Sequence, residues 1–151
     1  MQQLFAALAL AFFAMSPSYT TPEADAMATV TRFADAFNKG DAKTMVAMCA
    51  DHSVIIDEFA PYEWHGADGC AKWGEAYDVN ATQNKITGGK VTLGKPLHVD
   101  VTNDRAYIVT PVKYEFMQAG KPVVEPSSII TIALVKGGSG WRINGWAWSK
   151  R

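Results

Sequence analysis

The order of helical and extended patterns constrains this sequence more than any other feature. In the first third of the chain, apolar residues recur at helical spacing at Met27, Val30, Ala34 and Phe37. From Gly88 onward, long extended stretches alternate with turn residues, which predicts strands. Helices followed by a run of antiparallel strands are typical of an α+β domain.

Three helices are predicted before the main run of strands. The first begins after Thr21, with Pro22 at the first helical position, and it ends at Gly40. Asp41 predicts the cap of a short second helix, and Asp68 predicts the cap of a third. The apolar stripe of this third helix consists of Cys70, Trp73, Gly74 and Tyr77.

The predicted strands are long and contain proline and glycine. A first strand is expected from Val54 to Phe59, where Ile55, Asp57 and Phe59 share a face and the Ala60-Pro61 pair ends it. Later strands are expected over 91–101 with a bend near Gly94, 106–117 with a break at Pro111, 123–135 with a break at Pro126, and 141–148. Such interruptions predict a strongly bent sheet. Three helices against its concave side would enclose a pocket.

Length and charge limit the class of protein. The 151 residues predict one domain, and 48% hydrophobic and 19% charged residues are typical of a globular chain. The formal net charge is -1 with no long run of like charge, which argues against nucleic-acid binding through a basic face. No phosphate-binding glycine loop and no GxSxG motif is found. The expected partners are therefore small molecules or other proteins.

The N-terminal segment resembles a signal peptide. The apolar run Leu4–Met15 has 12 residues, which is too short to span a membrane but fits the apolar region of an export signal. Cleavage is expected after Ser18, with Ala26 as the other candidate, so that residues 1–18 are removed and 22–150 form the domain. The alternative is a short N-terminal helix on a cytosolic protein. We expect a secreted or periplasmic protein.

Three stretches of the chain are distinctive in their order and spacing: residues 32–41 with an Asn-x-Gly-Asp corner, residues 50–57, and Gly140-Trp141-Arg142-Ile143 followed by Trp146 and Trp148. Together they resemble the nuclear transport factor two-like superfamily, which includes SnoaL-like proteins and ketosteroid isomerases. The resemblance covers about Pro22 to Lys150. It implies a cone-shaped α+β fold with a pocket, and by analogy a homodimer formed through the outer sheet face. The same fold serves many activities, so the site must decide the function.

Asp57 is the candidate catalytic residue. A carboxylate on an apolar pocket wall is desolvated, which raises its pKa and suits a general base. In the pattern of ketosteroid isomerase, the position that Asp57 matches holds the catalytic base. The alternative is that Asp57 ends a strand and bonds to backbone or solvent.

The hydrogen-bond donors of that isomerase pattern are poorly matched. The position of its tyrosine matches Phe33, which has no donor, and the position of its protonated aspartate matches Ser128, a weaker donor. Tyr77, Tyr107, Tyr114 and His98 are substitutes, although core or rim packing is the ordinary role of such residues. The expected ligand-binding residues are Phe33, Phe59, Tyr62, Trp64, Trp73, Tyr77, His98, Tyr114 and Ser128.

The remaining candidates concern cysteines, metals and the last strand. Cys49 and Cys70 either form a disulfide or pack as two buried thiols. No metal and no cofactor is expected, since Asp57 and Glu58 would point to opposite faces of a strand. In the last strand, Trp146 and Trp148 are expected to face away from Trp141 and Ile143, as a ligand wall or a dimer interface.

The sequence thus favours an exported protein that binds a small, mostly apolar molecule in its pocket. One alternative is a cofactor-independent isomerase, lyase or cyclase that uses Asp57 as its base. A second alternative is a non-catalytic, dimeric interaction module.

Overall fold

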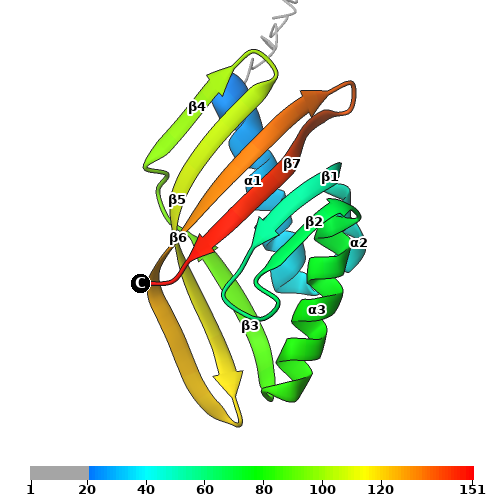
Figure 1. Ribbon diagram of the computed structural model, residues 1–151. Coiled ribbons are helices and arrows are strands. Elements are labelled where there is room, and N and C mark those ends of the chain that lie inside the picture. The colour runs from blue at the N-terminus through cyan, green and yellow to red at the C-terminus, as the bar shows by residue number, and fades with distance from the viewer. Residues whose placement is uncertain (1–20) are drawn as a thin grey trace, which may run out of the picture.

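The computed structural model describes residues 21–151, and in these residues three helices pack against one curved sheet (Figure 1). The helices are α1 (Pro22–Lys39), α2 (Ala42–Ala47) and α3 (Gly69–Gln83). In Figure 1, α1 lies behind the sheet and α3 lies beside its right-hand end. The predicted α+β cone is confirmed. The proposed signal segment lies outside the described residues, in which no helix is long and apolar enough to cross a membrane.

The sheet contains seven strands in the order β2-β1-β7-β6-β5-β3, and β4 pairs with β5 beside this path. Neighbouring strands are antiparallel except β1 and β7, which run parallel. The long hairpin of β5 and β6 bends half-way along its length (Figure 1). The bounds are β1 (Cys49–Ile56), β2 (Glu63–Ala67), β3 (Ile86–Leu93), β4 (His98–Thr102), β5 (Arg105–Gln118), β6 (Lys121–Gly137) and β7 (Gly140–Ser149).

Local signals set the helix ends. Thr21 Oγ1 accepts a hydrogen bond from the backbone N of Ala24, and Gly40 ends α1 in the left-handed conformation at φ 67°. Asp41 accepts from the backbone N of Thr44 at the start of α2. Asp68 is the N-cap residue of α3, as predicted. Its side chain makes no cap bond, however, because at a φ of 62° its left-handed backbone differs from the extended one usual at an N-cap.

The first strand lies earlier in the chain than predicted. β1 begins at Cys49 and ends at Ile56, so the predicted span Val54–Phe59 was wrong at both ends. The chain then turns, with Asp57 N donating to the carbonyl of Tyr62, and returns as β2, which was not predicted. Asp57 is therefore a turn residue at the end of a strand, and the side-chain alternation of the strand stops before it.

Proline and glycine bend the sheet without breaking its long strands. The predicted stretch 91–101 is two strands, and between them Gly94 N donates to the carbonyl of Pro111 at 2.7 Å. β5 and β6 run unbroken past Pro111 and Pro126. Near Pro126, however, the register slips by one residue, since Val112 pairs with Ser128 but Tyr114 pairs with Glu125. This bulge turns both Glu125 and Ser128 toward the core.

A second bulge changes the faces of β7. Ile143 pairs with Leu134 and Gly145 with Ala133, so β7 carries one extra residue at Asn144. Trp141, Ile143 and Trp146 are consequently all buried. The prediction that Trp146 faces away from Trp141 and Ile143 was wrong, because the bulge reverses the side-chain alternation of the strand.

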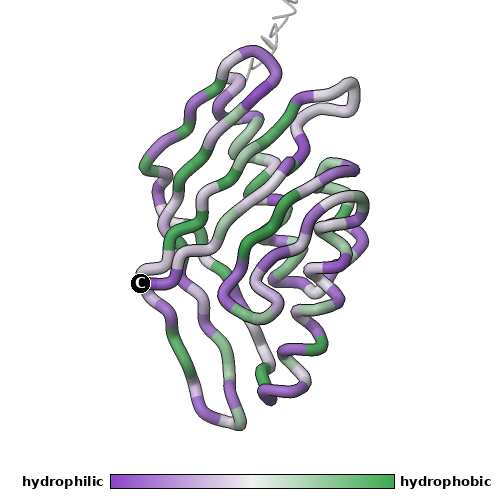
Figure 2. The backbone as a smooth tube through the Cα atoms, in the orientation of Figure 1, coloured by the Kyte–Doolittle hydropathy of each residue, from purple (hydrophilic) through white to green (hydrophobic). Residues whose placement is uncertain are grey.

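The core lies between α1, α3 and the concave face of the sheet. Its most completely buried large side chains are Ile55, Ile108, Ile132, Leu134 and Ile143, all from strands. Figure 2 shows the corresponding alternation of hydrophobic and hydrophilic residues along the strands. This alternation places one face of each strand in the core and the other in solvent.

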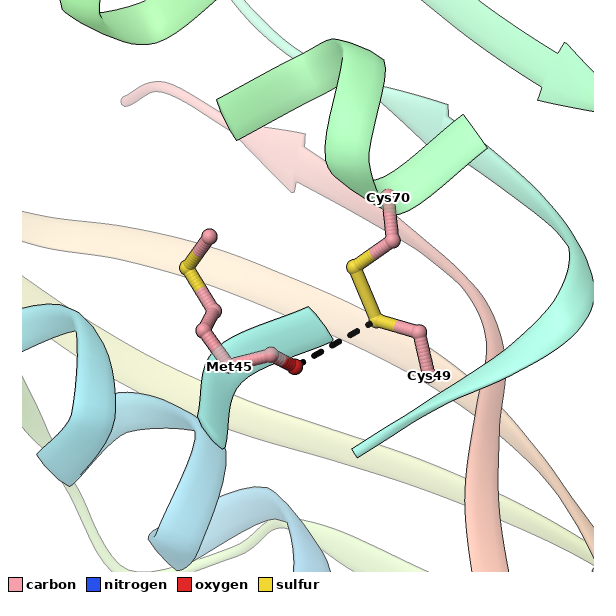
Figure 3. The surroundings of a disulfide bond; sticks show 3 residues. All are labelled: Met45, Cys49 and Cys70. Atoms are coloured by element: carbon pink, nitrogen blue, oxygen red, sulfur yellow. Dashed lines mark hydrogen bonds between the residues drawn. A yellow bond between two sulfur atoms is a disulfide. The ribbon is translucent and has the colours of Figure 1, made fainter. Parts of the chain in front are cut away.

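A disulfide joins Cys49, at the start of β1, to Cys70, in the first turn of α3 (Figure 3). Cys49 Sγ lies 3.9 Å from the carbonyl oxygen of Met45. Of the two alternatives left open by the sequence, the structure has the disulfide. The bridge fixes the N-terminal end of α3 to the edge of the sheet.

Candidate functional site

A cavity of about 210 Å³ lies within the cone. Strands β5, β6 and β7 contribute buried aliphatic side chains such as Val112, Ile132 and Ile143. Helices α1 and α3 contribute Phe33 and Trp73 on the opposite side. The space lies between the concave face of the sheet and helices α1 and α3.

Asp57 lines the cavity, and both of its carboxylate oxygens have a protein donor. Oδ1 accepts from the backbone N of Glu58, and Oδ2 accepts from Nε1 of Trp73, each at 2.7 Å. Burial raises the pKa of Asp57 above its ordinary value, and the charge of Glu125 raises it further. Asp57 thus has structural features of both alternatives, the strand-end residue and the desolvated carboxylate. It ends a strand and bonds to backbone, and it also presents a desolvated carboxylate to the cavity.

Two tyrosines of the lining meet through their hydroxyl groups. The hydroxyl oxygens of Tyr77, on α3, and Tyr114, on β5, are 2.6 Å apart. Burial raises the pKa of both phenols, so both stay neutral near pH 7. Either hydroxyl can donate to the other, which leaves the proton of the acceptor free for a ligand. The pair fits beneath β3 because Gly89 has no side chain there.

Glu58, Glu125 and Lys150 form an ion cluster at the edge of the cavity, hereafter the rim cluster. Lys150 Nζ lies 2.6 Å from Oε1 of Glu125 and 3.3 Å from Oε2 of Glu58. Burial and the charge of Glu125 raise the pKa of Glu58, and the hydrogen bond to Glu125 raises that of Lys150. Glu58 and Lys150 line the cavity directly.

Residues 26–149 match the model of the SnoaL-like domain family. The chain belongs to that family. The superfamily resemblance drawn from the sequence is thereby confirmed. Membership supports small-molecule binding or isomerase-like chemistry in general and leaves the ligand to the site. Among curated protein sequences, none matches the chain.

Solved structures resemble this SnoaL-like domain in fold. A ketosteroid isomerase-like protein from Erwinia carotovora atroseptica is 17% identical with a TM-score of 0.68, over 87% of this chain and 98% of that chain. An NTF2-like protein with a cystatin-like fold from Novosphingobium aromaticivorans is 16% identical with a TM-score of 0.67, over 83% and 79%. The S. rosetta CaMKII hub is 17% identical with a TM-score of 0.69, over 88% and 99%. At these identities the likeness concerns the fold alone.

Six of the residues expected at the site line the cavity of this SnoaL-like domain. They are Asp57, Phe33, Phe59, Trp73, Tyr77 and Tyr114. Trp73 is central among them, because its ring packs against those of Phe33, Phe37 and Tyr77 at 5.8–6.2 Å and against Trp146 at 4.9 Å. These aromatic contacts form one continuous wall.

Four expected ligand-binding residues lie outside the lining. Tyr62 is 60% exposed in the turn before β2, and His98 is exposed because the break before β4 takes that strand away from the cavity. Trp64 is buried in β2 and packs on Phe59 at 4.9 Å. Ser128 is buried in β6, next to the bulge. The assignment of these four residues to the pocket is corrected accordingly.

The rim cluster was not predicted from the sequence. Glu58 was expected to point away from Asp57, but both line the cavity because β1 ends before them. An acid in the otherwise apolar stretch around Glu125 was the one available signal. Within residues 21–151, no group of three or more histidine, cysteine or acidic residues is arranged to hold a metal ion.

Proposed function

We propose that this SnoaL-like domain binds a small, mostly apolar molecule in the cone cavity, oriented by Asp57 and the Tyr77–Tyr114 pair. The observation that carries the proposal is the lining itself, in which aromatic and aliphatic side chains surround a few convergent polar groups. This combination is typical of ligand sites in proteins.

The size of the cavity limits the ligand. An engineered cavity of about 150 Å³ holds one benzene molecule. The 210 Å³ of this cavity therefore suit one ring with short substituents. A four-ring skeleton would have to extend beyond it.

The test compares the wild type with a variant whose cavity is filled. Ala34 lines the cavity, so Ala34→Leu should abolish binding of a one-ring probe such as n-propylbenzene. Ala133→Leu adds the same volume at an exposed position of β6 and is the control. Native mass spectrometry of protein from its own host would also report a retained small molecule. Equal binding by wild type and Ala34→Leu would contradict the proposal.

A second candidate function is cofactor-independent isomerase, lyase or cyclase chemistry with Asp57 as general base. The raised pKa of Asp57 and the two phenol hydroxyls in the same cavity favour it. Phe33 lacks a donor and Ser128 lies outside the lining, so the tyrosine pair would supply hydrogen bonds to a developing negative charge. Asp57→Asn should then abolish turnover and spare probe binding. Unchanged turnover would remove Asp57 from the mechanism.

We also propose that the protein is exported and acts as a homodimer. The Cys49–Cys70 disulfide supports export, because disulfides persist in oxidising compartments. N-terminal sequencing of protein from its own host tests this, and an intact Met1 would contradict it. The alternative of a non-catalytic dimeric module requires a large interface and no ligand. Light scattering combined with the probe titrations distinguishes these cases.

A further inference from the structure

We infer that the cavity selects a cation, namely a small amine whose apolar body fills the cone and whose ammonium group lies against Asp57, Glu58 and Glu125. This inference rests on the proposed function, because it names the class of molecule that the same cavity takes. Four observations carry it: the balance of charge, an unpartnered carboxylate oxygen, the aromatic lining and the behaviour of Lys150.

The first observation is an excess of negative charge at one side of the cavity. Asp57 and Glu58 line the cavity, Glu125 lies just behind them, and Lys150 is the one cationic residue that lines the cavity in the described part of the chain. The three carboxylates repel one another, since the charge of Glu125 raises the pKa of both Asp57 and Glu58. An ammonium group held among them relieves this repulsion.

The second observation is an oxygen of Glu125 that has no partner. Glu125 is only 8% exposed, and while its Oε1 accepts from Lys150, its buried Oε2 accepts no hydrogen bond within residues 21–151. Glu125 is the direct cross-strand partner of Tyr114, which lines the cavity, and it lies just behind the lining, where its Oε1 reaches Lys150. A buried carboxylate oxygen without a donor is costly. An ammonium group brings three donors.

The third observation is the aromatic character of the lining near these acids. Phe59 directly follows Glu58, and the rings of Tyr114 and Trp148 lie 6.2 Å apart. The faces of such rings attract cations, more strongly where water is excluded. Aromatic walls and carboxylates together favour an organic cation over a neutral molecule of the same shape.

The fourth observation is that an ammonium group already occupies this position. Lys150 Nζ lies between Glu58 and Glu125, yet the lysine side chain is 58% exposed and has a flexible four-carbon stem. It can therefore move into solvent when a ligand amine takes its place. An anionic ligand is disfavoured because Lys150 is already neutralised by two carboxylates.

The experiment compares three probes that share a phenyl group and a short chain. They are 2-phenylethylammonium, neutral n-propylbenzene and anionic 3-phenylpropanoate, titrated against the full chain by calorimetry or tryptophan fluorescence. We expect the amine to bind about tenfold to a hundredfold more tightly than the neutral probe, the range of one charge-assisted hydrogen bond. Glu58→Gln should bring the ratio of amine affinity to n-propylbenzene affinity several-fold closer to one.

Lys150→Met gives the sharpest outcome. Removal of the competing ammonium should strengthen binding of the amine severalfold relative to binding of the neutral probe. Lys113→Met makes the same charge change at an ion pair with Glu115, outside the cavity, and should leave the amine affinity within about twofold.

Two results would overturn the inference while the proposed function stands. One is equal affinity for the amine and n-propylbenzene. The other is tightest binding of 3-phenylpropanoate, weakened by Lys150→Met, which would make Lys150 an anion site. If none of the three probes binds, the proposed function fails for molecules of this size, and the inference fails with it.

Discussion

Nε1 of the Trp73 indole donates a 2.7 Å hydrogen bond to Oδ2 of Asp57, sixteen residues earlier in the chain. The bond connects α3 to the turn that follows β1. Because the Trp73 ring also packs against Phe33, Phe37 and Trp146, the position of the carboxylate depends on the whole aromatic wall. The candidate base and the apolar lining are therefore one structural unit.

Replacing Trp73 with phenylalanine should remove the hydrogen bond that connects Asp57 to the aromatic wall. Trp73→Phe removes a donor to a buried carboxylate and leaves a small void, so we expect a loss of about 2–4 kcal/mol in the free energy of unfolding near pH 7. Denaturant unfolding measures it. A double-mutant cycle with Asp57→Asn should give a coupling energy of about 1–3 kcal/mol. Strictly additive effects would show that the hydrogen bond contributes nothing.

The raised pKa of Asp57 predicts a specific pH dependence. The folded state binds the proton more tightly than the unfolded chain, whose value is near 3.8, so this contribution to stability is complete below about pH 4 and is lost as pH rises through the folded pKa. Asp57→Asn does not titrate there. Its stability relative to wild type should increase from pH 4 upward and then level off.

Urea unfolding between pH 3.5 and 7.5 tests this dependence. The control variant is Asp104→Asn, which changes an exposed acid in the turn between β4 and β5. A stability of Asp57→Asn relative to wild type that stays constant, or that decreases as pH rises, would contradict the raised pKa.

Gly89 is predicted to be essential for the tyrosine pair. A Cβ at this position would lie 2.6 Å from Oη of Tyr77 and 3.0 Å from Oη of Tyr114. Gly89→Ala should therefore destabilise the protein by about 1–3 kcal/mol, as overpacking usually does. Gly137→Ala, where a Cβ meets no atom within 4 Å, should stay within about 0.5 kcal/mol of wild type. Adding Tyr77→Phe to Gly89→Ala should recover part of the loss, and no recovery would point to backbone strain instead.

The disulfide is expected to contribute substantially to stability. Cys49 and Cys70 are separated by 21 residues, and closing a loop of that size stabilises the fold by about 3 kcal/mol. The double variant Cys49→Ala/Cys70→Ala should lose this amount in denaturant unfolding. Reductant should lower the unfolding midpoint of wild type and leave the double variant unchanged. A reductant-insensitive wild type would contradict the prediction.

The sequence predicted those parts of the fold that depend on neighbours in the chain. Thr21 and Gly40 mark the ends of α1 because capping involves residues within one turn. Asp57 stood out because an acid beside apolar residues is visible in the sequence. The positions of Trp73 and Tyr77 in the lining also followed from helical spacing.

Tertiary structure decided what depends on strand pairing. Hydrogen bonds to partners far along the chain determine where β1 ends and where β6 and β7 bulge. Each one-residue shift of register reverses which side chains of the strand face the core. The rim cluster illustrates the consequence. Glu58, Glu125 and Lys150 meet because β1, β7 and β6 are adjacent in the sheet, and no local pattern encodes that adjacency.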